Sequence, residues 1–258
     1  MPQTKIVFFD IDGTLIDMQA KKITPKMLET LHRLQDRGIK ICIATGRSPM
    51  VLPKIDGVAF DAYLTFNGSL CYDRKGVIFS NPIPHKDVVR FIQNAAALGR
   101  PVCVSTRDRL AANGADTDLT DYFFIANEPV PVADDFDAVC AEDIYQLMLG
   151  CRPKDYPALL DGAPGAKITA WWDRAVDIIP AGGGKGIGIE KMLAYYGLDK
   201  AEALAFGDGN NDREMLQAVG IGVAMENGSP ELKAIADEIC GPVYEDGIYH
   251  YCADKGLI

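Results

Sequence analysis

The N-terminal part of the chain alternates apolar runs with amphipathic segments. Residues 6–9 are four consecutive large apolar residues, the pattern of a strand buried on both faces of a parallel sheet. Thr24-Pro25 has the composition of a helix N-cap followed by proline at the first helical position, and apolar residues then recur at helical spacing until Gly38. A second apolar run covers residues 39–44, so this region predicts a βαβ unit. We further expect a helix that begins at Ser48-Pro49, a strand over 61–65 and a hairpin over 72–78.

Between residues 84 and 182 the pattern changes from alternation to clustered short strands. An apolar face recurs at helical spacing from Val88 to Ala95 and ends at Gly99. A second helix is expected over 154–160, and short strands over 102–106, 122–125, 144–149, 168–172 and 176–179. Strands that cluster in this way predict a separate α+β module inserted into the first domain.

After residue 182 the alternation of strands and helices returns. The pattern predicts a helix from Lys185 to Gly197, a strand over 203–206, a helix around Met215, a strand over 221–224, a helix that begins at Ser229-Pro230 and a strand over 238–240. The predicted fold class is therefore α/β. A Rossmann-like three-layer core with a mainly parallel sheet is built from residues 1–83 and 183–258, and an α+β cap domain occupies residues 84–182.

Composition excludes several classes of protein. The net charge of the 258 residues is −10 and no Lys/Arg cluster exceeds two residues, which argues against nucleic-acid binding. No apolar run approaches the length of a membrane span, and the first predicted strand follows residue 5 too closely for a signal peptide. The seven cysteines include no Cys-x-x-Cys pair and read as core residues of a cytoplasmic protein. No protein partner is evident.

Polar residues follow three of the predicted strands. Asp10 and Asp12 come after the first strand, Thr45-Gly46-Arg47 after the second, and Asp208-Gly209-Asn210-Asn211-Asp212 after the strand at 203–206, while Lys185 begins the helix before it. The carboxyl ends of parallel strands meet at one edge of a sheet, where ligands bind in α/β folds. Asp10-Ile11-Asp12-Gly13 alone is also compatible with a simple turn.

The ordered set of motifs resembles the haloacid dehalogenase-like (HAD) hydrolases, and within them the Cof-type branch, subclass IIB. The resemblance rests on four stretches and spans residues 5 to about 248: Asp10-Ile11-Asp12-Gly13-Thr14, Thr45-Gly46-Arg47, Lys185-Gly186 and Gly207-Asp208-Gly209-Asn210-Asn211-Asp212. It implies a magnesium-dependent phosphatase that acts through an aspartyl-phosphate, with a C2-type cap that selects the substrate.

The resemblance also implies a role for each site residue. Asp10 is the nucleophile, Asp12 the general acid and base, and Lys185 the cation that steadies the phosphate charge. Phosphate binding falls to Thr45, Gly46, Asn67 and Asn211. The Mg²⁺ ligands are Asp10, Asp12, Asp208 and Asp212. The roles of Arg47 and of Trp171-Trp172 stay open.

The chemistry of these residue types agrees with this assignment. A carboxylate can attack phosphorus to form an acyl-phosphate, and a neighbouring carboxyl group can protonate the leaving oxygen. Mg²⁺ suits a site of crowded carboxylates because it is a hard cation that prefers oxygen ligands. We expect a small phosphorylated metabolite as substrate. The acidic tract from Asp116 to Asp121 favours one phosphate on a neutral or cationic body, such as a sugar phosphate. A phosphomutase on the same scaffold and a phospho-ligand sensor are the alternatives.

Overall fold

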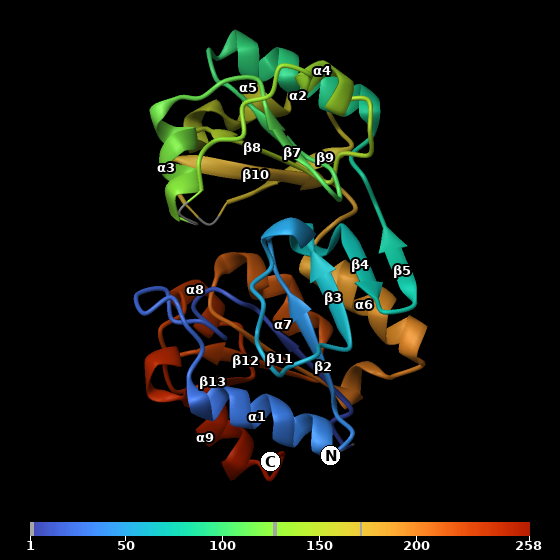
Figure 1. Ribbon diagram of the computed structural model, residues 1–258, viewed down its shortest axis with the longest axis vertical. Coiled ribbons are helices and arrows are strands. Elements are labelled where there is room, and N and C mark those ends of the chain that lie inside the picture. The colour runs from blue at the N-terminus through green and yellow to red at the C-terminus, as the bar shows by residue number, and fades with distance from the viewer. Residues whose placement is uncertain (1–2, 126–127, 171) are drawn as a thin grey trace. The chain divides into compact units, whose positions relative to one another are not determined.

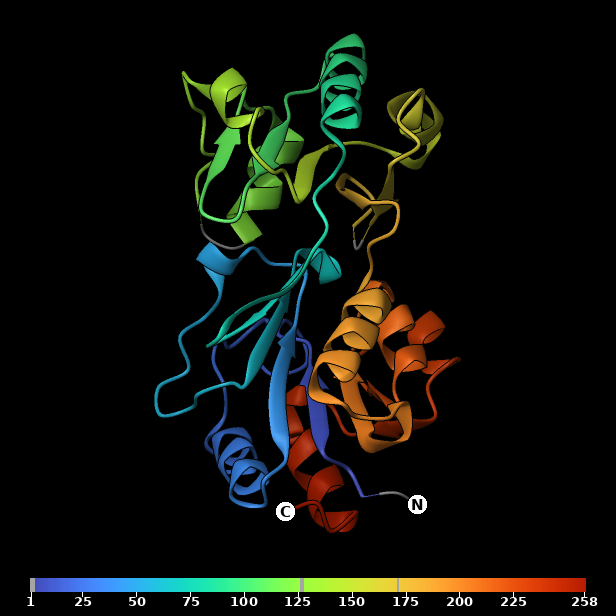
Figure 2. The ribbon, with the colours of Figure 1, turned by 90° about the vertical axis from the view of Figure 1, so that its right-hand side faces the viewer.

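The computed structural model describes residues 3–125, 128–170 and 172–258, which form two compact units (Figures 1 and 2). The first unit contains the described residues of Met1–Arg47, Pro53–Ser80 and Gly184–Ile258, and the second those of Ser48–Leu52 and Asn81–Gly183. These units differ from the expected domain limits at residues 48–52, 81–83 and 183. We retain 1–83 with 183–258, and 84–182, as a proposal for the domain boundaries.

An eight-stranded sheet forms the centre of the first unit, in the order β13-β12-β11-β1-β2-β3-β4-β5. The strands are β1 Ile6–Phe9, β2 Lys40–Ala44, β3 Ala62–Thr65, β4 Leu70–Asp73, β5 Gly76–Ser80, β11 Ala203–Gly207, β12 Ile221–Met225 and β13 Glu238–Cys240. The pairs from β13 to β3 are parallel, and the β3–β4 and β4–β5 pairs are antiparallel. The mainly parallel sheet that the sequence predicted is therefore confirmed.

Helices cover both faces of this sheet and give the three layers (Figure 2). The helices of the first unit are α1 Pro25–Asp36, α6 Lys185–Tyr196, α7 Arg213–Ala218, α8 Pro230–Lys233 and α9 Gly247–Asp254. On one face Ile6 and Phe8 of β1 pack in a core with residues of α6, α7 and α8. On the other face Phe9 stacks on Phe206 with ring centroids 5.5 Å apart, and Phe206 meets Tyr251 of α9 edge-on. Strand β1 is thus buried on both faces, as its continuous apolar run predicted.

The second unit is built on a five-stranded antiparallel sheet, in the order β7-β6-β8-β10-β9. Its strands are β6 Cys103–Ser105, β7 Leu110–Ala112, β8 Gln146–Gly150, β9 Ala166–Thr169 and β10 Ala175–Pro180, and its helices are α2 His85–Ala97, α3 Thr117–Ile125, α4 Phe136–Val139 and α5 Tyr156–Leu160. Apolar residues of α2, α4 and α5 pack against one face of this sheet. The predicted α+β composition of the inserted module is confirmed.

Two predicted elements are wrong. The segment 122–125 is not a strand but the end of α3, because Asp116 accepts the Leu119 N–H at the start of that helix and Leu119 and Phe123, four residues apart, pack together in an apolar cluster. The helix expected after Ser48-Pro49 is only a 3₁₀ turn, Pro49–Val51, because Pro53 follows and cannot continue a helix. The sequence also did not predict β7, α4 or α9.

Within the described residues, no helix combines the length and the apolar composition that a membrane-crossing segment requires.

Candidate active site

Three neighbouring strands of the first sheet bring the polar residues to one edge. Strand β1 pairs with β2 on one side and with β11 on the other. Asp10 directly follows β1, and its N–H donates to the Phe206 carbonyl at 3.0 Å. Thr45 follows β2 and Asp208 follows β11, so residues that are remote in sequence lie on adjacent strand ends.

Lys185 is fully buried at this edge. It is the first residue of α6, and its Nζ donates to Asp10 Oδ1 at 2.7 Å and to Asp212 Oδ1 at 2.5 Å. Burial disfavours the charged ammonium, but the charges of Asp10 and Asp212 outweigh it and raise the pKa of Lys185 above its ordinary value. The lysine is therefore a fixed positive charge between two carboxylates.

Asp212 organises the loop after β11. Its Oδ2 accepts the backbone N–H groups of Asp208 and Gly209 at 3.0 and 2.9 Å, while its Oδ1 accepts from Lys185. Both oxygens of this fully buried carboxylate thus hold protein donors. The expected role of Asp212 as a metal ligand stays a prediction.

Asp208 is held by the glycine and threonine that follow Asp12. Thr14 is buried and donates its hydroxyl to Asp208 Oδ1 at 2.8 Å. Gly13 has a φ of +84°, and a Cβ at this position would lie 2.3 Å from Asp208 Oδ2. Only glycine therefore allows the chain to pass so close to this carboxylate. The sequence singled out neither contact, because nothing in the chain pattern says which carboxylate a hydroxyl will reach.

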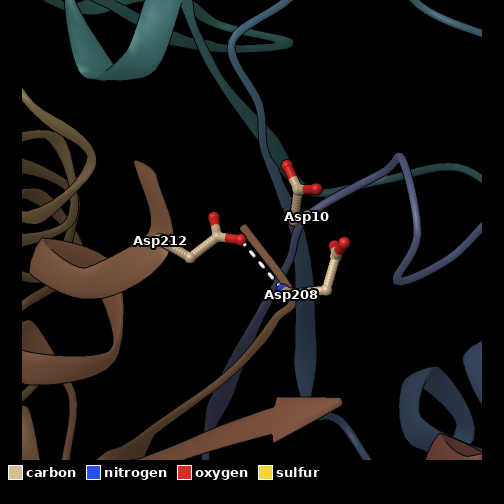
Figure 3. A group of neighbouring side chains, drawn as sticks. All are labelled: Asp10, Asp208 and Asp212. Atoms are coloured by element: carbon tan, nitrogen blue, oxygen red, sulfur yellow. Dashed lines mark hydrogen bonds between the residues drawn. The ribbon is translucent and has the colours of Figure 1, made fainter. Parts of the chain in front are cut away.

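Three carboxylates face one another at the strand ends (Figure 3). Asp10, Asp208 and Asp212 each offer an oxygen atom, and these oxygens all lie within 4.8 Å of one another. With Asp12, four carboxylates share this edge with two cations, Lys185 and Arg47. Two negative charges remain uncompensated when all four carboxylates are ionised. An all-oxygen donor set with this excess charge fits a hard divalent cation such as Mg²⁺.

The pKa values of two of these carboxyl groups record the crowding. Burial, and then the charges of Asp212, Asp208 and Asp12, raise the pKa of Asp10 well above its usual range although Lys185 opposes the shift. Burial and the charge of Asp212 raise the pKa of Asp208 to about 7. The protein alone therefore favours protonation at a place where a cation would favour ionisation.

The four predicted phosphate-binding residues lie close together in the first unit. Thr45 Oγ1 accepts the Arg47 N–H at 3.1 Å, which leaves its hydroxyl proton available to a ligand. The Asn67 N–H donates to the Thr45 carbonyl at 3.0 Å, and Asn67 Oδ1 accepts from Asn211 Nδ2 at 3.2 Å. A Cβ at Gly46 would lie 3.1 Å from Asn67 Nδ2. Asn67 also has a φ of 51°, a conformation that asparagine tolerates and that is common at binding sites.

Asp12 lies beside this group, but its carboxylate points to an arginine. Arg47 Nε donates to Asp12 Oδ2 at 2.8 Å and Arg47 Nη2 donates to Asp12 Oδ1 at 2.6 Å. Among the described residues, Asp12 is not part of the three-carboxylate group. Its expected roles as acid, base and metal ligand stay predictions.

The sequence assigns no role to the two tryptophans. Trp171 lies outside the described residues, and Arg174 Cζ lies 4.8 Å from the centroid of the Trp172 ring.

Comparisons with known proteins place this site in a family. A sequence model described as haloacid dehalogenase-like hydrolase matches residues 7–252. YkrA of Bacillus subtilis (strain 168), whose name assigns it provisionally as a phosphatase, is 34% identical over 99% of both chains.

Two solved structures are similar along the whole chain. The phosphatase BT1666 from Bacteroides thetaiotaomicron has a TM-score of 0.92 and 31% identity, and the comparison covers 99% of this chain and 96% of that one. The sugar phosphatase BT4131 of HAD subclass IIB has a TM-score of 0.88 and 29% identity, with coverage of 99% and 100%. The chain belongs to the haloacid dehalogenase-like hydrolases, in the Cof-type subclass IIB, and is a phosphoric monoester hydrolase.

Proposed function

We propose that this chain is a Mg²⁺-dependent phosphatase that hydrolyses a small phosphate monoester through an aspartyl-phosphate at Asp10. The observation that carries the proposal is the setting of Asp10. One oxygen of its carboxylate is held by the buried Lys185, and the group lies among the carboxylates of Asp208 and Asp212 at the edge of the sheet. A carboxylate fixed in this way can attack a phosphorus atom without first reorganising its surroundings.

The reaction has two steps. In the first, an Asp10 carboxylate oxygen attacks phosphorus, the bond from phosphorus to the leaving oxygen breaks, and the Asp12 carboxyl group gives its proton to that oxygen. In the second, water attacks the phosphorus and gives its proton to Asp12. The acyl-phosphate bond then breaks, which releases inorganic phosphate and restores the Asp10 carboxylate.

The metal site we propose centres on Asp10 and Asp208. Their carboxylates lie next to each other, and Asp208 keeps its orientation through the Thr14 hydroxyl. Asp212 supports the loop, and Asp12 faces Arg47. When bound, Mg²⁺ supplies positive charge that offsets the repulsion between the phosphate and the carboxylates. We assign binding of the phosphate oxygens to Thr45, Gly46, Asn67 and Asn211, which lie close together.

The substrate we propose is a sugar phosphate or a similar small metabolite. BT4131, which is similar over the whole chain, is a sugar phosphatase. The acidic tract from Asp116 to Asp121 does not support this choice of substrate, although the sequence predicted that it would. Asp116 pairs with Arg100, and Asp118 and Asp121 pair with Arg174. The tract is neutralised and does not repel anionic substrates as a run of free carboxylates would.

The test is hydrolysis of p-nitrophenyl phosphate with and without Mg²⁺. Asp10→Asn should show no turnover, and the wild type quenched during turnover should carry phosphate on the Asp10 peptide in mass spectrometry. The matched control is Asp17→Asn, which changes a half-exposed aspartate of the same loop and should keep full activity. Turnover by Asp10→Asn would refute the covalent route. A screen of phosphorylated metabolites, read as released inorganic phosphate, then ranks substrates, and transfer to an added sugar-phosphate acceptor would indicate a phosphomutase instead.

A further inference from the structure

The function proposed above gives Asp12 a role in proton transfer but gives none to Arg47, the residue with which its carboxylate pairs. The guanidinium binds the carboxylate with two nearly parallel hydrogen bonds, Nε to Oδ2 at 2.8 Å and Nη2 to Oδ1 at 2.6 Å. This two-point arrangement is specific to arginine, since a lysine ammonium has no planar fork. Two bonds fix both the position and the plane of a carboxylate, whereas one bond lets it rotate.

The main chain holds both partners at the strand ends. The Arg47 N–H donates to Thr45 Oγ1, and the Arg47 carbonyl accepts the Phe66 N–H at 3.0 Å. On the other side, Asp12 lies in the short turn after β1, where the Gly13 N–H donates to the Ile16 carbonyl at 2.9 Å. The arginine backbone is therefore anchored to the threonine that we assign to phosphate binding, and its side chain reaches across to the adjacent strand end.

Stability does not account for this pair. The side chains of Arg47 and Asp12 are 30% and 32% exposed. An ion pair with that access to water contributes about 0–1 kcal/mol to folding. Burial disfavours the charged Arg47, yet the hydrogen bonds and charge of Asp12 raise its pKa above the ordinary arginine value, so the guanidinium stays charged. A pair that stabilises the fold so little is better explained by its effect on the position of the Asp12 carboxylate.

We propose that Arg47 is a positioning residue that orients the Asp12 carboxyl group for proton transfer to and from the reacting phosphate ester. The inference rests on the proposed function, because it assigns the arginine to the step in which Asp12 acts. Each carboxylate oxygen accepts one arginine N–H and keeps a second lone pair, through which a proton can move. In the first step that proton goes to the leaving oxygen, and in the second it returns from water. Arg47 takes no part in either bond change.

The size of the effect follows from general acid catalysis. A positioned acid contributes about 10²–10⁴-fold to a rate, and a displacement of about 1 Å can cost about 10²-fold. The gain depends on the leaving group. An alkoxide needs a proton as it departs, whereas p-nitrophenolate leaves readily without one. Loss of Arg47 should therefore matter for alkyl phosphates and little for p-nitrophenyl phosphate.

The experiment measures kcat/KM, which reports the first chemical step, for a series from p-nitrophenyl phosphate to phenyl phosphate and alkyl phosphates. Four proteins are compared with the wild type: Arg47→Met, Arg47→Lys, Asp12→Ala and the double variant Asp12→Ala/Arg47→Met. Arg33→Met is the matched control, since Arg33 is also an ion-paired arginine of the first unit but pairs with Glu29 on α1. It should match the wild type on every substrate.

We expect Arg47→Met to lower kcat/KM by about 100-fold for alkyl phosphates and by less than about threefold for p-nitrophenyl phosphate. Arg47→Lys should recover part of the loss on alkyl phosphates. The double variant should be no worse than Asp12→Ala, because the arginine acts through that carboxylate. Circular dichroism and thermal unfolding should show that all variants fold.

Two results would overturn the inference while leaving the proposed function intact. A uniform fall across the series would make Arg47 a binding residue for the substrate rather than a positioning residue. Additive losses in the double variant would show that it acts independently of Asp12. Failure of the proposed function itself looks different, since Asp12→Ala would then show the same leaving-group dependence as the wild type and Asp10→Asn would still turn over.

Discussion

Replacing Lys185 by methionine tests the electrostatic design of the site most directly. The substitution keeps an unbranched side chain of similar length and removes the ammonium that lies 2.7 Å from Asp10 Oδ1 and 2.5 Å from Asp212 Oδ1. The lysine side chain has no exposed surface, so water cannot replace the lost donor. Two carboxylates would then remain buried next to each other without their cation.

The expected loss of unfolding free energy in Lys185→Met can be compared with the loss on breaking an exposed ion pair. Removal of one partner from a buried ion pair costs about 3–5 kcal/mol, because the other charge is left without compensation. Lys5 pairs with Glu202 in the same unit, but its side chain is 54% exposed. An exposed pair contributes about 0–1 kcal/mol. Lys5→Met is therefore the matched control. For a chain of this length, the Lys185→Met loss corresponds to a fall in Tm on the order of 10 °C.

The assay is unfolding of the metal-free protein by urea and by heat. Trp172 belongs to the second unit, so tryptophan fluorescence is not the probe chosen to follow unfolding of the first unit. Far-UV circular dichroism, together with hydrogen exchange at the amides of β1, follows the first unit. If Lys185→Met lost no more than about 1 kcal/mol, as expected for Lys5→Met, Lys185 would not be compensating buried carboxylates and our account of Asp10 would fail.

Three further predictions concern the same groups and the inserted module. Thr14→Val removes the hydroxyl that orients Asp208 and should weaken Mg²⁺ binding, measured by titration calorimetry, by about 10–100-fold. Thr14→Ser keeps the hydroxyl and should bind Mg²⁺ like the wild type. Equal Mg²⁺ affinities of the wild type and both variants would contradict this prediction. Because the pKa of Asp208 is raised to about 7, a proton competes with the metal below that pH, so Mg²⁺ affinity should rise with pH up to about 7 and then level off. The stability of the metal-free protein should change in the opposite direction and fall as the pH rises from about 4 through 7. In the second unit, burial raises the pKa of Asp118, but the hydrogen bonds from Arg152 and Arg174 outweigh it and hold this pKa below its ordinary value. The ionised Asp118 therefore stabilises the fold above a pH of about 4, and this stabilisation is lost in stronger acid. Asp118→Asn should therefore destabilise the protein at neutral pH more than in acid, and an equal loss at both would count against the network.

Much of the fold could be predicted from the sequence because burial leaves a local record. The continuous apolar runs of β1 and β11 are what a strand needs when helices cover both of its faces. The Thr24-Pro25 start of α1 is equally local, since the Thr24 hydroxyl accepts the N–H of Met27. Where the outcome depended on contacts from elsewhere in the chain, prediction failed. The aromatic residues at 122–125 favour a strand by propensity, but Tyr122 and Phe123 pack in an apolar cluster with Leu119, and the segment is a helix.

The same distinction between local sequence information and tertiary contacts applies to the site. The sequence by itself determined which residue types stand at the strand ends, and the parallel order of β1, β2 and β11 was enough to expect Asp10, Thr45 and Asp208 at one edge. Only the tertiary structure decided which charges meet. It pairs Lys185 with Asp10 and Asp212, Thr14 with Asp208, and Arg47 with Asp12. The physical reason is that a strand end fixes the position of a main chain, whereas the partner of a side chain depends on distances of a few ångströms between segments far apart in the sequence.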